Sequence, residues 1–192
     1  MSTFIVTIPN NRIGALIGPN GRVKNRLEKL AGVEVKIDSG SGEVFISSKP
    51  DIKDPFLVIK ARDIVHAVGR GFNPQIAFSL IDEDMYLEII NMKTVVGTNP
   101  NKLKRIRGRI IGKEGRTRRV IEETTGTRIS VFGNTVGIIG PYERLKVARD
   151  AVHLLLEGAK HGTVYGFLEE KAQKFRLSTR EIWDKASRDS KI

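Results

Sequence analysis

The sequence contains no cysteine, and its three histidines, His66, His153 and His161, are scattered along the chain. Without cysteine there is no disulfide, no thiolate nucleophile and no cysteine-based zinc site. The histidines match no metal-ligand spacing. We therefore expect no metal, no cofactor and no enzymatic activity.

Long apolar runs are also missing, because no stretch approaches the roughly 20 residues that a membrane-spanning helix needs. The first residues, MSTFIVTIPNNRIG, lack the basic and then apolar regions of a secretory signal. These two absences predict a cytoplasmic protein without a membrane partner.

What the sequence has in excess is positive charge, with a formal net charge of +11. Residues 1–99 hold 12 basic and 11 acidic residues, whereas residues 100–149 hold 13 and 4. Charge of one sign gathered in a short segment indicates a polyanionic partner. A charge run alone is more often a solvated face, so the surrounding motifs must show whether this segment binds a polyanion.

The sequence repeats itself at an offset of 94 residues. The identical positions of the first copy are Gly14, Ile17, Gly18, Gly21, Arg22, Glu28 and Gly32, and those of the second are Gly108, Ile111, Gly112, Gly115, Arg116, Glu122 and Gly126. Two copies are too few for a solenoid, so each copy must close its own core or pack on the other.

Each copy is predicted to run β-α-α-β-β-α, which gives an α+β fold with a three-stranded sheet packed by three helices. In copy one the elements are expected near residues 3–8, 10–17, 22–31, 33–37, 43–47 and 51–68. In copy two they are expected near residues 86–90, 101–111, 116–125, 127–132, 136–139 and 141–159, with Pro141 in the first turn of the last helix.

The predicted domains follow the repeat: residues 1–81, residues 82–160 and a C-terminal helical extension over residues 161–192. HGTVYG, at residues 161–166, is expected to break the helix before FLEEKAQKF resumes it. The acids Asp82, Glu83 and Asp84 are interpreted as a polar linker or a patch for a protein partner.

Each copy places a Gly-x-x-Gly loop between two helices. A helix that restarts at once after such a loop presents free backbone N–H groups at its positive end, and that end favours phosphate. The glycines also allow a sugar-phosphate chain to approach without a Cβ in the way. A Walker A loop is excluded, because Arg107 and Glu114 stand where it needs Gly and Ser or Thr.

RIIGKEGRTRRVIEETTGTRISV, in the second copy, resembles the eukaryotic-type KH domain. In that domain the GxxG loop clamps about four nucleotides of single-stranded RNA or DNA, and the bases lie on an aliphatic groove. The resemblance implies two tandem type I KH domains. No aromatic residue occurs between Asn91 and Val131, which argues against an RNA-recognition motif with stacking aromatics.

Both copies and the following VGIIGPYERLKVARDAVHLLLEGAKHGTVYGFLEE are similar to the archaeal and eukaryotic partner-of-Nob family of ribosome assembly factors. This resemblance implies binding to the 3′ end of small-subunit ribosomal RNA during maturation, beside the trimming endonuclease or a translation or assembly factor. The VYG segment, residues 164–166, is its most family-specific part. A general KH-type RNA-binding protein and a protein-interaction scaffold remain alternatives.

The residues expected to bind RNA lie at the two loops. In the second copy they are Arg105, Arg107, Gly108, Arg109, Ile111, Gly112, Lys113, Glu114, Gly115, Arg116, Arg118, Arg119 and Arg128, with Lys102 and Lys104 extending the positive track. In the first copy they are Gly18, Pro19, Asn20, Gly21, Arg22 and Lys24. GPNG also fits a plain helix–helix turn, so a structural role for the first loop stays open.

Overall fold

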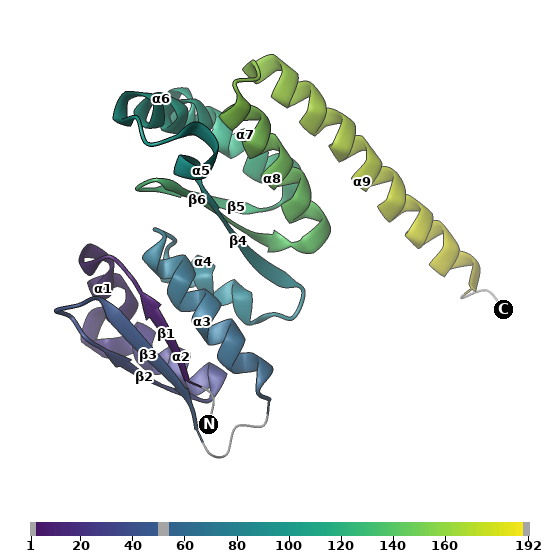
Figure 1. The fold of residues 1–192 in the computed structure, drawn as a ribbon. Helices are drawn as coiled ribbons and strands as arrows, with labels where there is room; N and C mark the ends of the chain where they lie inside the picture. The colour runs from purple at the N-terminus through teal and green to yellow at the C-terminus, as the bar shows by residue number, and fades with distance from the viewer. Residues whose placement is uncertain (1–2, 50–53, 190–192) are drawn as a thin grey trace. The chain divides into compact units, whose positions relative to one another are not determined.

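The computed structural model describes residues 3–49 and 54–189, with side chains as far as Leu177, and it confirms the α+β class (Figure 1). The first copy and its linker contain β1 (Thr3–Thr7), α1 (Asn10–Ile17), η1 (Pro19–Gly21), α2 (Arg22–Ala31), β2 (Val33–Ile37), β3 (Glu43–Ser48), α3 (Phe56–Gly69), α4 (Pro74–Ala77) and η2 (Phe78–Ile81). The second copy and the C-terminal extension contain β4 (Met85–Asn91), α5 (Met92–Val96), α6 (Pro100–Ile111), η3 (Lys113–Gly115), α7 (Arg116–Thr125), β5 (Arg128–Phe132), β6 (Thr135–Pro141), α8 (Tyr142–Glu157) and α9 (His161–Asp189).

The two sheets are three-stranded and antiparallel, with the orders β1-β3-β2 and β4-β6-β5. In the first sheet the side chains alternate between two faces, as strand geometry requires. Val6, Val35 and Ile46 lie on the buried face, whereas Ile5 is 61% exposed on the other. The predicted strand pattern of the first copy is therefore confirmed.

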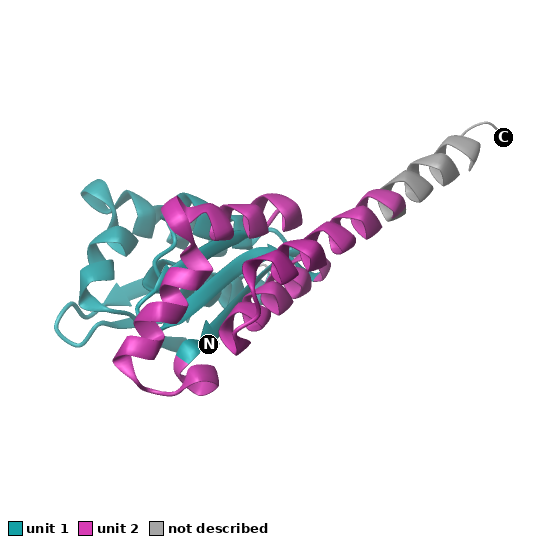
Figure 2. Cartoon of the chain, turned by 90° about the horizontal axis from the view of Figure 1, so that it is seen from above, with its two compact units in different colours: residues 1–92, 128–142 teal, residues 93–127, 143–192 magenta. Residues whose placement is uncertain are grey.

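The chain forms two compact units that do not follow the repeat (Figure 2). The first unit combines the chain as far as Met92 with residues 128–142, and so includes both sheets. The second combines residues 93–127 with the chain from Glu143 onward, and so includes α6, α7, α8 and α9. The domain boundaries expected at residues 81/82 and 160/161 remain a prediction about the repeat.

Arg12 explains part of the cohesion of the first unit. Its Nε donates to the carbonyl of Val68 at 2.8 Å, and its Nη2 donates to the carbonyl of Phe72 at 2.7 Å. The guanidinium carbon also lies 5.8 Å from the ring centre of Phe132 in the second sheet. One half-buried cation therefore connects α1, the end of α3 and β5.

Further contacts join the end of α3 to the second sheet. The hydroxyl of Ser130 donates to the carbonyl of Arg70 at 2.8 Å. A Cβ added to Gly137 would lie 2.6 Å from the Phe72 ring, so the absence of a side chain there lets the ring pack closely against β6. Ile139, on the same strand, belongs to the core of the first copy. We call these contacts and those of Arg12 the seam.

Lys60, on α3, holds the linker between the copies. The side chain is only 3% exposed, and Nζ donates to the carbonyls of Asp82 and Met85, each at 2.8 Å. Burial lowers the pKa of the Lys60 ammonium below its usual value, against the opposing effect of nearby acids. Asp82, Glu83 and Asp84 are themselves exposed, which fits the expected polar linker.

The second unit buries one face of each of its helices. The α6 residues Leu103, Ile106 and Ile110 are buried, and Asn99 caps that helix by accepting from the backbone N–H of Asn101 at 3.0 Å. This cap satisfies an N–H group that the helix itself cannot pair. On α8 the buried face includes Leu145, Val152 and Leu155. The start of α6 at Pro100 lies within one residue of the predicted start at residue 101.

Two boundary predictions are wrong. Pro141 is the last residue of β6, paired with Met85, and α8 begins at Tyr142. A strand end tolerates proline as readily as a first helical turn does, because neither position needs its missing N–H. HGTVYG does not break the helix but forms the first turns of α9, since Val164 and Leu168 supply a buried face across both glycines of this segment.

The third helix of the first copy was expected from residue 51, and residues 50–53 lie outside the described part of the chain. α3 begins at Phe56, whose N–H donates to the carboxylate of Asp54 at 2.8 Å. Across the described residues, the structure contains no helix with the length and apolarity needed to cross a membrane.

Candidate nucleic-acid interface

The two GxxG loops have the same backbone conformation. In the first loop Gly18 and Gly21 have φ 70° and 73°, and in the second loop Gly112 and Gly115 have φ 75° and 76°. These left-handed values favour glycine, since a Cβ is strained there. The equal conformations explain why the glycines recur at the 94-residue offset.

The first glycine of each loop is also required by space. A Cβ on Gly112 would lie 2.3 Å from Oγ1 of Thr117, and one on Gly18 would lie 2.4 Å from Cγ2 of Val23. A Cβ on Gly115 would meet no atom within 4 Å. The second glycine of the GKEG loop thus serves backbone conformation alone and leaves open space beside the loop.

The start of α7 has no side-chain cap, and its N-cap residue is Gly115 in the left-handed conformation. The backbone N–H of Arg116 donates to the carbonyl of Lys113 in the preceding turn, so the N–H groups after it are the ones that lack a partner within the helix. The first N–H groups of a helix have no intrahelical partner, and the helix dipole makes that end positive. The side chains around it, Lys113 and Arg116, are exposed. This arrangement suits a phosphate group.

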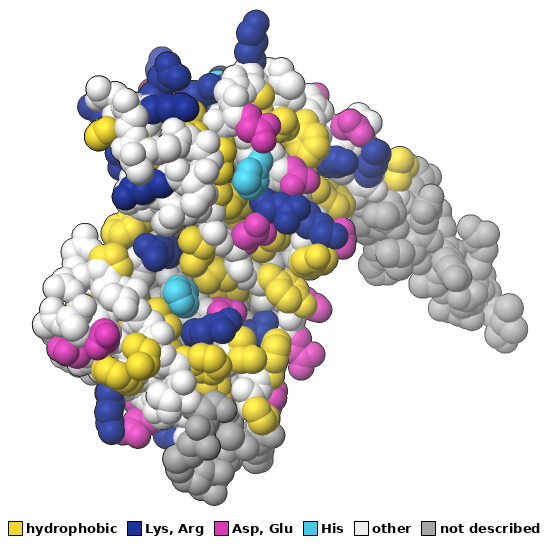
Figure 3. Space-filling view, in the orientation of Figure 1, with side chains coloured by type: hydrophobic (Ala, Val, Ile, Leu, Met, Phe, Trp, Pro, Cys, Tyr) yellow, Lys and Arg dark blue, Asp and Glu magenta, His cyan; other side chains and the backbone are white. Residues whose placement is uncertain are grey.

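The structure gathers most predicted site residues of the second copy in the second unit. Arg105, Arg107, Gly108, Arg109 and Ile111 lie on α6, Gly112, Lys113, Glu114 and Gly115 form the loop, and Arg116, Arg118 and Arg119 lie on α7. Lys and Arg side chains cluster over α6 in Figure 3. Arg128 is exposed at the start of β5 in the first unit, so it is not counted with the loop residues.

Not all of these cations are equally available. Arg105, Arg116 and Arg119 are exposed. Arg118 lies 3.8 Å from Glu122 in an i,i+4 ion pair, which is worth little at an exposed position. Arg109 is half-buried, and its guanidinium donates to the carbonyl of Ala159 between α8 and α9. Arg109 therefore has a structural contact besides any contact with RNA.

A pocket of about 380 Å³ opens beside the GKEG loop, lined by Gly112, Lys113, Arg116, Thr117, His161 and Tyr165. The Thr117 and Tyr165 hydroxyls lie 3.1 Å apart and share a hydrogen bond. His161 Nε2 lies 3.0 Å from the carbonyl oxygen of Arg109 and donates to it, because a carbonyl only accepts. The sequence prediction missed His161 and Tyr165, although it singled out the VYG segment that contains Tyr165.

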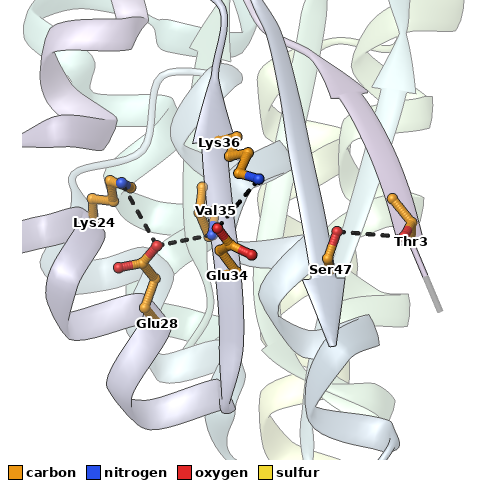
Figure 4. Close-up of polar contacts among 7 residues, drawn as sticks. All are labelled: Thr3, Lys24, Glu28, Glu34, Val35, Lys36 and Ser47. Atoms are coloured by element: carbon orange, nitrogen blue, oxygen red, sulfur yellow. Dashed lines mark hydrogen bonds and ion pairs between the residues drawn. The ribbon is translucent and has the colours of Figure 1, made fainter. Parts of the chain in front are cut away.

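The first loop carries less free charge. Lys24 lies 3.6 Å from Glu28, whose carboxylate also accepts from the N–H of Val35 at 2.8 Å (Figure 4). Arg26 packs over the ring of Phe78 at 4.6 Å, and Arg12 is held in the seam. These contacts leave Arg22 as the exposed cation directly after GPNG.

The described residues contain no group of three or more His, Asp or Glu side chains that could hold a metal ion. The polar features around the GKEG loop are instead backbone N–H groups, hydroxyls and cations. Their chemistry fits an anionic ligand.

Two family descriptions match the chain. Residues 86–173 match the "Eukaryotic type KH-domain (KH-domain type I)", and residues 3–59 match the "KH domain". The two matches coincide with the two copies of the repeat, so the KH resemblance of both copies is confirmed.

Known proteins are similar over nearly the whole chain. A KH domain-containing protein of Methanocaldococcus jannaschii is 46% identical over 97% of this chain and 81% of its own length. The RNA-binding protein pno1 of Dictyostelium discoideum is 30% identical over 85% of this chain and 69% of its own. Dim2p of Pyrococcus horikoshii, solved in a complex with a/eIF2α and rRNA, is 46% identical, with a TM-score of 0.86 over 90% of this chain and 95% of the other. The chain belongs to the partner-of-Nob (PNO1/Dim2) family of KH-domain proteins.

Proposed function

We propose that this protein binds single-stranded RNA at the 3′ end of small-subunit ribosomal RNA during ribosome assembly and maturation. The observation that carries the proposal is the GKEG loop, where an uncapped helix start lies beside the exposed cations Lys113 and Arg116. The RNA backbone binds at this loop, and the helix N–H groups receive its phosphates.

The exposed cations determine how strongly the strand is held. Lys113, Arg116 and Arg119 each neutralise phosphate charge, and the α6 cations Lys102, Lys104 and Arg105 extend the positive track. Each neutralised phosphate releases counterions, so the affinity falls steeply as the salt concentration rises. The first loop, with fewer exposed cations, contributes less to RNA binding.

Relatives support the ribosomal assignment. Dim2p of Pyrococcus horikoshii has been solved with rRNA, and relatives in several fungi are named pre-rRNA-processing proteins. By the same similarity, the partners of this chain include a translation factor of the a/eIF2α kind, and a maturation endonuclease is a further candidate. The protein acts in the cytoplasm by binding rather than by catalysis, through KH domains at residues 1–81 and 82–160 and the extension at 161–192.

The proposal is tested with the paired change Lys113→Asp and Glu114→Asp in the full-length chain. Binding of a labelled single-stranded RNA with the 3′-terminal rRNA sequence is measured by fluorescence anisotropy at several salt concentrations. We expect at least a tenfold loss of affinity and a shallower salt dependence. The matched control places the same acids in the first loop, as Pro19→Asp and Asn20→Asp, and should lose less.

Specificity is tested by competition with scrambled RNA of equal length. Preferential displacement by the 3′-terminal sequence supports the ribosomal role, whereas equal displacement favours a general RNA-binding protein. Unchanged RNA binding by a folded Lys113→Asp/Glu114→Asp variant would show that the GKEG loop is not the clamp.

A further inference from the structure

The C-terminal helix α9 reaches the clamp loop, and it brings two aromatic rings with it. His161 and Tyr165 line the pocket beside Gly112, Lys113 and Arg116. Their ring centres lie 6.2 Å apart with an interplanar angle of 46°, so they stand next to each other without stacking. The rest of the basic segment, from residue 92 to residue 131, has no aromatic residue.

Hydrogen bonds at both ends of the first turn of α9 hold these rings in place. Tyr165 bonds to Thr117, which is only 2% exposed on α7, and His161 donates to the carbonyl of Arg109 on α6. Val164 and Leu168 are buried on the same helix. The rings are therefore fixed relative to the loop before any ligand arrives, which lowers the entropic cost of binding.

The repeat provides an internal comparison. Thr117 of the second copy corresponds to Val23 of the first, which has no hydroxyl to bond. Lys113 corresponds to Pro19, which has no charge. The two loops share one backbone conformation, so the hydroxyl, the cation and the aromatic helix are additions specific to the second loop.

We propose that this pocket holds one nucleotide of the bound RNA outside the four that a KH groove accommodates, with its base against the rings of His161 and Tyr165. The inference rests on the proposed function. Lys113 and Arg116 bind the phosphate of this nucleotide, and Tyr165 offers a ring face to the base, as aromatic residues do in other single-strand binders. A volume of about 380 Å³ lies at the low end of the range for pockets that hold small organic ligands.

The test is a double-mutant cycle with the full-length protein, in which one change removes a base of the RNA and the other changes a side chain of the pocket. A labelled single-stranded RNA with the 3′-terminal rRNA sequence is made with an abasic site at each position in turn. In the wild-type protein, one position outside the core of four should show a loss of about 5- to 100-fold. Tyr165→Leu, which keeps an apolar side chain but removes the ring, should abolish the loss at that position alone.

Tyr165→Phe is the matched control, because it removes the bond to Thr117 and keeps the ring; it should retain the position-specific loss. A cross-link from 4-thiouridine at that position to the peptide containing residues 161–165, found by mass spectrometry of wild-type protein, tests the same point without a variant. The proposal is overturned if Tyr165→Leu and wild type respond alike at every position, or if cross-links map only elsewhere. In that case the Lys113→Asp/Glu114→Asp result still decides separately whether the loop is the clamp.

Discussion

Asn20 and Glu114 have the same left-handed backbone conformation, with φ 51° and ψ 32° for the first and φ 52° and ψ 29° for the second. They occupy the third position of the two GxxG loops. Asparagine tolerates this conformation, whereas glutamate rarely adopts it. The second loop therefore carries backbone strain that the first avoids.

Glu114→Asn should relieve this strain and raise the free energy of unfolding by about 0.5–1 kcal/mol. Chemical denaturation of the purified variant measures the change. The reciprocal substitution Asn20→Glu is the control and should lower stability by a similar amount. Changes of the same sign in the two variants, or no change in either, would show that the left-handed conformation is not the source of the difference.

Gly112→Ala should destabilise the protein by more than about 2 kcal/mol, because it combines a positive φ with a collision against Thr117. Gly115→Ala adds only the positive-φ cost, about 1 kcal/mol. Gly108→Ala, at an open position inside α6, should stabilise by about 0.5–1 kcal/mol. Thermal unfolding of the three variants should rank their stabilities in this order. Equal losses of stability at Gly112 and Gly115 would contradict the predicted steric clash with Thr117.

Arg12→Leu should lower the free energy of unfolding by about 2 kcal/mol or more, since it leaves the carbonyls of Val68 and Phe72 without their charged donor. Arg22→Leu removes an exposed cation of the first copy and should change stability by less than about 0.5 kcal/mol. Urea denaturation of both variants measures the contrast. If the two variants lose the same stability, the seam does not depend on Arg12.

Stability should fall as the pH drops below about 6.5, the usual pKa of histidine. Burial lowers the pKa of His66 in the folded state, and the neighbouring Arg70 and Arg62 act in the same direction against Asp63. The unfolded chain then binds a proton more readily than the folded one, so stability decreases from pH 6.5 down to the lower folded-state pKa. His66→Gln should reduce this decrease when unfolding is compared at pH 7.5 and 5.5, and an unchanged decrease would count against His66.

Local sequence patterns predicted those parts of the fold that local forces determine. The glycines at 112 and 115 mark the loop between two helices through their backbone conformation, and the structure has the helix ends there. HGTVYG was misjudged because two glycines locally disfavour a helix. The burial of Val164 and Leu168, a tertiary effect, outweighs that preference.

The remainder of the candidate site depends on contacts between distant residues. Thr117 and Tyr165 are 48 residues apart in the sequence, and the hydrogen bond between their hydroxyls joins two different helices. Arg12, a basic residue in the helix before the first loop, bonds to carbonyls more than 50 residues away. No periodicity within one helix records such pairings, so the pocket and the seam become visible only in three dimensions.

The first unit is built from two separate segments of the chain, and this affects how it forms during synthesis on the ribosome. Its last strands, β5 and β6, are translated after α6 and α7, so Ser130 reaches the carbonyl of Arg70 only once residues 93–127 have been made. At about 5–20 residues per second, the 15 residues from Arg128 to Tyr142 take about one to three seconds to add. During that interval the nascent chain already includes the cationic loop segment, while the seam that completes the first unit has yet to form.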